Sequence, residues 1–176
     1  RKKKKARQII DMIDELLKKY NLYITKIENN YSYRLIEKVD TKEHEAGSID
    51  AVILQNEEVH PHARHLKSGK KHEVDVIHIS WLEIQKEYSG RSYGTVMLIY
   101  AICNILVDRP DITYATLDDD SDRSDRLKNI YSGIRFSHDD HTELLGRNKT
   151  KLNGPEKTCY MGDDYLDFLV MKIRTL

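Results

Sequence analysis

The chain has 176 residues, of which 39% are apolar and 33% charged, a composition typical of a globular protein rather than a disordered one. Its 29 Lys and Arg residues balance its 29 Asp and Glu residues, so the whole chain has no basic bias toward nucleic acid. The longest uninterrupted apolar run, residues 96–103, is far shorter than the roughly 20 residues that a membrane-spanning helix needs. We therefore expect one domain over residues 1–176, without a membrane segment.

The two cysteines, Cys103 and Cys159, are too few for a disulfide framework. Cys103 lies inside the apolar run, and a buried thiol fits a reducing, intracellular and cytoplasmic compartment. The basic opening RKKKKAR is expected to be a solvated, frayed terminus, with a nuclear address or a nucleic-acid contact as the alternative. Because the sequence does not begin with Met, we expect a fragment or a processed form.

Hydrophobic periodicity predicts an amphipathic helix over residues 6–20, with apolar side chains three or four positions apart. Three short strands and a polar loop are expected next, at residues 22–27, 33–39, 48–55 and 56–72. The β-branched run 74–84 predicts the strongest strand, and its nearly continuous apolar character indicates a central position.

Residues 94–107 are apolar on nearly every face and predict a buried helix that Pro110 ends. A strand is expected at residues 112–117 and a short helix at 125–133. A connection or excursion is expected at 137–158 and a closing strand at 166–173. This order predicts an α/β (α+β) fold, in which helices pack on a mixed sheet.

The segment between the central strand and the buried helix has the composition of an anion-binding turn. The first turn of a helix carries unpaired N–H groups and the positive end of the helix dipole, so it attracts phosphate. The segment supplies two glycines, three hydroxyls and a cation: Gly90, Gly94, Ser89, Ser92, Thr95 and Arg91. It matches neither the Walker loop nor the G-x-G-x-x-G pattern. The composition predicts a pyrophosphate cradle, and a plain strand-to-helix turn is the alternative.

The stretch EYSGRSYGTVML resembles the acetyl-CoA loop of the GNAT (GCN5-related N-acetyltransferase) superfamily, whose pattern is Gln/Arg-x-x-Gly-x-Gly/Ala after the fourth strand. Ser89 stands where the family has Gln or Arg, Ser92 stands where it has Gly, and Gly94 fits strictly. A second stretch, NIYSGIRF, resembles the family's second motif through Tyr131 and Phe136. The stretch LVMKI resembles the family's last strand.

The resemblance implies a GNAT-like fold, with a central, mostly antiparallel sheet that is splayed between its fourth and fifth strands and flanked by helices. It also implies an acetyl-CoA-dependent N-acetyltransferase that transfers acetyl directly to an amine acceptor in a ternary complex. The alternative is a non-catalytic module on the same fold that binds CoA or a partner.

The resemblance also implies roles for individual residues. Main-chain groups of Leu82 and Ile84 pair with the pantetheine arm and the acetyl carbonyl, and Tyr131 donates a proton to the leaving thiolate. The CoA pyrophosphate is bound by the loop and the helix start: Ser89, Gly90, Arg91, Ser92, Tyr93, Gly94 and Thr95. A base must keep the amine neutral, and His78, Glu83 and Asp118 are the candidates.

Two further clusters lie in polar segments. The spacing of His60, His62 and His65 matches no closed structural zinc site. The favoured interpretation is a loop with incidental metal affinity, so we expect no metal. Asp118 opens an acidic run that lacks the Gly and Glu of a calcium loop. The run is either an acidic rim that attracts a cationic amine, on a small molecule or a protein, or a solvated loop that caps the next helix. The sequence does not predict the oligomeric state.

Overall fold

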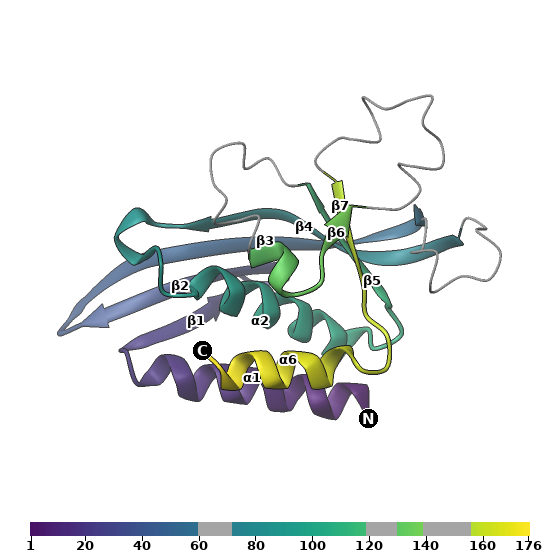
Figure 1. The fold of residues 1–176 in the computed structure, drawn as a ribbon. Helices are drawn as coiled ribbons and strands as arrows, with labels where there is room; N and C mark the ends of the chain where they lie inside the picture. The colour runs from purple at the N-terminus through teal and green to yellow at the C-terminus, as the bar shows by residue number, and fades with distance from the viewer. Residues whose placement is uncertain (60–71, 119–129, 139–155) are drawn as a thin grey trace. The chain divides into compact units, whose positions relative to one another are not determined.

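The computed structural model of the chain describes residues 1–59, 72–118, 130–138 and 156–176, which are coloured in Figure 1. The histidine cluster, most of the acidic run and the first part of the short helix lie outside these described residues. Among the described residues, no helix is both long and apolar enough to cross a membrane.

The described chain forms two compact units. The first unit contains Arg1–Val52, Ser80–Asp111 and Asp163–Leu176. The second unit contains the described parts of Ile53–Ile79 and Ile112–Gly162.

The helices and strands follow one another as α1 (Lys2–Lys18), β1 (Leu22–Lys26), β2 (Tyr31–Val39), β3 (Lys42–Val59), β4 (His72–Ile84), the 3-10 helix η2 (Lys86–Tyr88), α2 (Tyr93–Asp108), β5 (Tyr114–Asp118), β6 (Ser137–His138), β7 (Glu156–Tyr160) and α6 (Tyr165–Arg174). The strands form one sheet in the order β1-β2-β3-β4-β5-β7-β6. β4 pairs with β5 in parallel, whereas β1–β2, β2–β3, β5–β7 and β6–β7 are antiparallel. The predicted α/β mixed sheet is confirmed.

The pairing between β4 and β5 is short, as a splayed sheet requires. Ile77, His78 and Ile79 pair with Ala115, Thr116 and Leu117. β4 continues from Ser80 to Ile84 beyond the last of these pairs.

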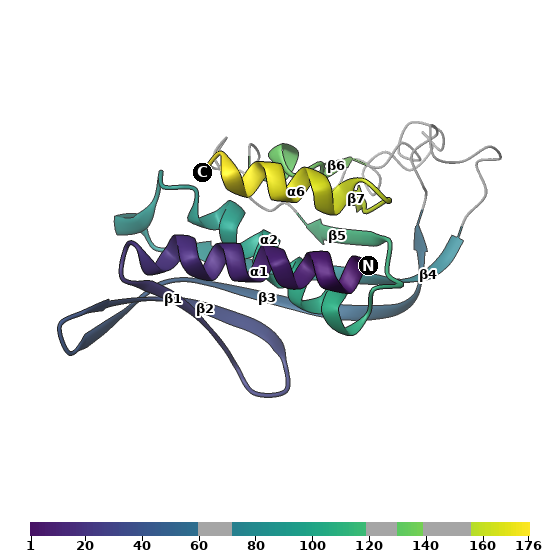
Figure 2. The same ribbon diagram turned by 90° about the horizontal axis from the view of Figure 1, so that it is seen from below.

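In the first unit, α1 packs against α2, α6 and β1, and α2 also packs against β2. Figure 1 shows the three helices on the same side of β2 and β3, and the view from below in Figure 2 shows α1 alongside α2. Most of α2 is buried, including Cys103, so the predicted buried helix and buried thiol are confirmed.

The basic opening of the chain is helical, so the predicted frayed terminus is wrong. α1 begins at Lys2, and Ala6 is the first of its fully buried residues. Lys5 forms an ion pair with Asp167 of α6. Burial lowers the pKa of Lys2, and the nearby charge of Asp163 opposes that effect. Packing of α1 therefore extends into the lysine run, which local composition alone did not reveal.

The predicted closing strand at residues 166–173 is also wrong, because Tyr165–Arg174 forms helix α6. Its buried residues recur with the three-to-four spacing of a helix: Tyr165, Leu166, Leu169, Val170 and Ile173. The last strand is β7, which lies at the end of the segment that the sequence assigned to a connection.

Tyr33 on β2 carries a buried hydroxyl for which the described residues supply no hydrogen-bond partner. Its ring meets the Tyr100 ring of α2 edge-on, with 5.5 Å between centroids. Burial raises the pKa of Tyr33 above its ordinary value. The ring therefore contributes packing, whereas the hydroxyl costs desolvation energy.

Replacement of Tyr33 by Phe should consequently raise the free energy of unfolding by about 1 kcal/mol, as measured by urea denaturation. Tyr31→Phe is the matched control, because the Tyr31 hydroxyl donates a 2.7 Å hydrogen bond to Asp108, and its loss should lower stability by about 0.5–1.5 kcal/mol. A larger loss in Tyr33→Phe than in Tyr31→Phe would contradict this assignment.

Candidate functional site

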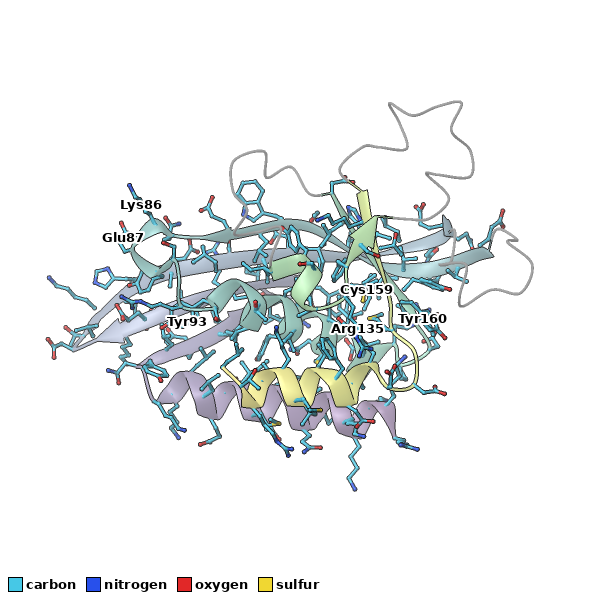
Figure 3. All side chains as sticks on the ribbon, viewed as in Figure 1. Lys86, Glu87, Tyr93, Arg135, Cys159 and Tyr160 are labelled. Atoms are coloured by element: carbon cyan, nitrogen blue, oxygen red, sulfur yellow. The ribbon has the colours of Figure 1, made fainter. Side chains whose placement is uncertain are left out.

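The turn that joins β4 to α2 lies wholly within the first unit. β4 ends at Ile84, the short helix η2 follows, and α2 begins at Tyr93. Figure 3 shows Lys86 and Glu87 projecting from the turn and Tyr93 at the start of α2. The strand–loop–helix arrangement predicted from the sequence is confirmed.

Several hydrogen bonds hold the turn. The Gln85 N–H donates to the Ala46 carbonyl at 2.8 Å, and the Ser89 hydroxyl donates to the Lys86 carbonyl at 2.8 Å. The Tyr88 hydroxyl donates to Glu37 of β2 at 2.7 Å, and this bond raises the pKa of Tyr88. The turn is thus tied to β2 and β3 rather than only to its own ends.

Arg91 is oriented by aromatic neighbours. Its guanidinium lies over the Tyr88 ring at 6.0 Å from the centroid, and the Tyr88 and Tyr93 rings are 6.5 Å apart. Arg91 remains exposed to solvent. An exposed cation that rests on an anchored ring is well suited to meet an anion.

Gly90 has a φ of 80°, in the left-handed region that favours glycine. A Cβ atom built on Gly90 would meet no other atom within 4 Å. The backbone at this residue therefore faces open space, where a ligand can approach the main chain closely.

Ser92 also has a left-handed backbone, with φ 66° and ψ 15°, although it is not glycine. This is the residue that stands where the GNAT pattern has Gly. The backbone explains that preference, since a left-handed conformation costs a non-glycine residue about 1–2 kcal/mol. The chain keeps the turn's geometry despite the serine.

The start of α2 is electrostatically open to an anion. The Ser92 side chain makes no capping hydrogen bond to α2, and the first turn of the helix contains no acidic residue. The helix dipole therefore remains uncompensated by these groups. Gly94 and Thr95 are buried, whereas Gly90, Arg91 and Ser92 are exposed, so a ligand reaches the turn more readily than the helix interior.

The end of β4 is packed tightly against β3. A Cβ atom on Gly47 of β3 would lie 2.7 Å from the Ile84 side chain and 2.8 Å from the Glu83 carbonyl. Leu82 and Ile84 are half-buried, and Glu83 between them is exposed. Close packing keeps this end of β4 extended up to the turn.

A cavity of about 400 Å³ adjoins the turn within the first unit. Its wall is largely apolar and aromatic, with one cation: Leu16, Leu17, Tyr20, Arg91, Tyr93, Val96 and Leu176. Arg91 thus belongs both to the exposed turn and to the cavity wall.

Tyr131 lies in the second unit, on a helical turn at residues 130–133. The residue is 6% exposed, and its carbonyl accepts a 2.9 Å hydrogen bond from the Phe136 N–H. The Lys157 ammonium on β7 lies 5.8 Å from the centroid of the Tyr131 ring. Lys157 itself is only 5% exposed.

Lys157 was not predicted as a site residue, because its segment was assigned to a connection. Residues 156–160, EKTCY, do not alternate between polar and apolar, so the usual strand pattern was absent there.

The pairing register separates the candidate proton-transfer groups of the second unit onto two faces of the sheet. His78 pairs with Thr116, and Thr116 pairs with Thr158. Lys157 is the next residue along β7 and points to the opposite face, because side chains alternate along a strand. The structure therefore does not bring His78 to the face on which Lys157 meets Tyr131.

His78 is instead hydrogen-bonded to the Thr116 hydroxyl through Nδ1, at 2.8 Å. Asp118 is exposed at the end of β5 and shares the face of Thr116, since it lies two residues further along the strand. Among the described residues, no three His, Cys, Asp or Glu side chains gather closely enough to hold a metal ion.

The left-handed backbone at Ser92 predicts opposite effects of two serine-to-glycine changes. Ser92→Gly should raise the free energy of unfolding by up to about 1 kcal/mol, because it relieves strain. Ser89→Gly should lower it by about 0.5–1 kcal/mol, since Ser89 has φ −70° and also loses its hydroxyl bond. Urea denaturation measures both, and effects of equal sign would be inconsistent with the turn described.

The comparisons with known proteins bear on the fold. No protein-family model and no curated protein matches the sequence. One similar solved structure is a tyrosine-to-phenylalanine mutant of the AtaT toxin, bound to the C-terminus of the antitoxin AtaR and to acetyl-CoA. Its sequence is 11% identical to this chain, and the TM-score is 0.52 over 79% of this chain and 71% of that chain. A structure described as a bacterial toxin is 12% identical, with a TM-score of 0.52 over 82% of this chain and 72% of that chain.

AtaT complexed with acetyl-methionyl-tRNAfMet is 10% identical, with a TM-score of 0.50 over 73% of this chain and 69% of that chain. At these identities the likeness concerns the fold. The chain has the GNAT fold, the fold of the GCN5-related N-acetyltransferases.

Proposed function

We propose that the chain is an acetyl-CoA-dependent N-acetyltransferase that transfers acetyl directly to an amine acceptor in a ternary complex. The observation that carries the proposal is the turn between β4 and α2, where Gly90 leaves the backbone open and Arg91 is held beside an uncapped helix start. Support also comes from the GNAT fold and from an AtaT structure that contains acetyl-CoA.

The turn fits the anionic part of acetyl-CoA. Main-chain N–H groups from Gly90 to Thr95 would bind the pyrophosphate, with those of the exposed residues Gly90 to Ser92 the most accessible, and Arg91 would add a positive charge. The extended main chain at Leu82 and Ile84 would pair with the pantetheine arm. When bound, acetyl-CoA would supply an activated thioester carbonyl.

The proton transfers would fall on other residues. Tyr131 would give its hydroxyl proton to the departing sulfur, and a base would remove the proton that keeps the acceptor amine charged. His78, Glu83 and Asp118 remain the candidate bases. His78 already has a hydroxyl partner in Thr116, while Glu83 and Asp118 are exposed.

The acceptor would be an amine on a small molecule or a larger molecule. The exposed carboxylates of Glu83 and Asp118 would favour a cationic amine over an anionic one. One GNAT-fold neighbour is solved with acetyl-methionyl-tRNAfMet. The amino group of an aminoacyl ester is therefore one kind of acceptor to consider for this chain.

A non-catalytic module that binds CoA or a partner is the second candidate. Ser89 and Ser92 favour it, because both depart from the GNAT loop pattern and Ser92 strains the turn. A CoA-binding module would share cofactor binding with the enzyme and lack its chemistry, whereas a partner-binding module would lack both.

Acetyl-CoA at about 100 times its dissociation constant should raise the free energy of unfolding by about 2.7 kcal/mol. This corresponds to a rise in the melting temperature of about 5–10 °C. Arg91→Glu should abolish this shift, because it places a negative charge beside the pyrophosphate. Arg174→Glu, at an exposed position on α6, makes the same charge change and should retain the shift. No shift in the unmodified chain at millimolar acetyl-CoA would refute the proposal.

Tyr131→Phe should lower turnover by about 100-fold or more, since it removes the proton donor, while the dissociation constant for acetyl-CoA stays unchanged. Release of the CoA thiol in the presence of a polyamine or a lysine peptide measures turnover, and calorimetry measures binding. A binding module would show no turnover to lose and unaltered acetyl-CoA affinity.

A further inference from the structure

Lys157 is a buried lysine in the second unit. It sits on β7 between two neighbouring strands, since it pairs with Leu117 of β5 and His138 of β6. Only 5% of the residue is exposed, whereas lysine is almost never fully buried unless its charge is compensated. One neighbour of this buried cation is the Tyr131 ring, whose centroid lies 5.8 Å from the ammonium.

The turn that carries the Tyr131 ring is fixed relative to the same strand. The Tyr131 carbonyl accepts hydrogen bonds from the Ile134 and Phe136 N–H groups at 3.2 and 2.9 Å. The Cys159 thiol, also on β7, lies 3.7 Å from the Ile134 carbonyl as a weak hydrogen-bond donor. The ammonium of Lys157 and the Tyr131 ring, 5.8 Å apart, are thus held by one network.

A cation at this separation affects the two states of a phenol differently. It attracts the face of a neutral aromatic ring weakly, by about 0.5–2 kcal/mol. It attracts a phenolate far more strongly, because an opposite charge within about 4–6 Å favours the ionised form. The surroundings strengthen this difference, since both residues are largely removed from water.

We infer that Lys157 is a positioning residue that makes Tyr131 a better proton donor, by holding its ammonium against the ring. The inference rests on the proposed acetyl transfer. As the carbon–sulfur bond breaks, sulfur keeps the electron pair, and Tyr131 gives it the hydroxyl proton. The phenolate left behind carries one negative charge, which Lys157 balances until a proton from water restores the phenol.

The turn that carries Tyr131, β7 and the two strands paired with β7 contain other ionisable residues. Among the described residues these are Arg135 in the same turn, Tyr114 and Asp118 on β5, His138 on β6, and Glu156, Cys159 and Tyr160 on β7. A test must therefore remove the charge of Lys157 alone. Lys157→Met does so with a side chain of similar length, and replacement of a buried charge by an apolar group is often tolerated.

The first measurement is the titration of the Tyr131 phenol, followed by tyrosinate absorbance. The difference between chains with and without Tyr131→Phe isolates this one phenol from the other tyrosines. Lys157→Met should move the midpoint up by about one pH unit or more. Lys157→Arg should retain the original midpoint, and so should Lys38→Met, which removes an exposed lysine of β2.

The second measurement is turnover in a double-mutant cycle. Lys157→Met should lower kcat by about 10-fold in the unmodified chain and have no further effect in the Tyr131→Phe background. Equal losses in both backgrounds would overturn the inference, because Lys157 would then act by another route.

The two measurements distinguish failure of the inference from failure of the proposed function. An unchanged Tyr131 midpoint in Lys157→Met overturns the inference, whatever the turnover. Absence of acetyl transfer in the unmodified chain, despite a shifted midpoint, overturns the proposed function instead. If Lys157→Met does not fold, Lys157→Gln keeps the titration test possible, with circular dichroism as the check on folding.

Discussion

Burial of α2 is the constraint on which the first unit depends. A helix that is apolar on nearly every face must be covered on every face, and in this chain α1 and β2 both pack against it. The packing of α1 and β2 against α2 fixes where α2 begins. Its first residue, Tyr93, follows a left-handed Ser92, and the turn before it is tied to Glu37 and Ala46. The open helix start is therefore a consequence of core packing, and the proposed anion site depends on that packing.

In the second unit, the candidate proton-transfer residues are divided between the two faces of the sheet. On one face the Lys157 ammonium meets the Tyr131 ring, and on the other His78 is hydrogen-bonded to Thr116. The proposed proton donor and one of the proposed bases thus have partners on opposite faces of the sheet. Such separation suits a reaction in which the donor and the acceptor of protons act on different atoms.

Sequence reasoning found the elements whose side-chain pattern is strong. Residues 74–84 and 94–107 have only one favourable environment, a central strand and a buried helix, and the structure confirms both. The opening lysine run and residues 166–173 were misassigned for a physical reason. In both, the stabilising contacts are tertiary, since α1 and α6 pack against each other and Lys5 pairs with Asp167.

In the candidate site too, local features were predicted from the sequence and tertiary contacts were not. The turn at Gly90 was recognisable because its chemistry is local, in glycines, hydroxyls and a cation that are contiguous in the chain. The contact between Lys157 and Tyr131 was not, because it joins residues far apart in sequence through the strand β7, which had been assigned to a connection. Likewise, only the strand register reveals that His78 and Lys157 face opposite ways.

The central claim is that the turn between β4 and α2 binds the pyrophosphate of CoA. Backbone amide NMR during titration with CoA tests it most directly, because each N–H group reports its own environment. The account predicts that the largest shifts occur at residues 90–95, with smaller ones along the end of β4. Unchanged signals at residues 90–95, with CoA-dependent shifts elsewhere in the chain, would contradict it.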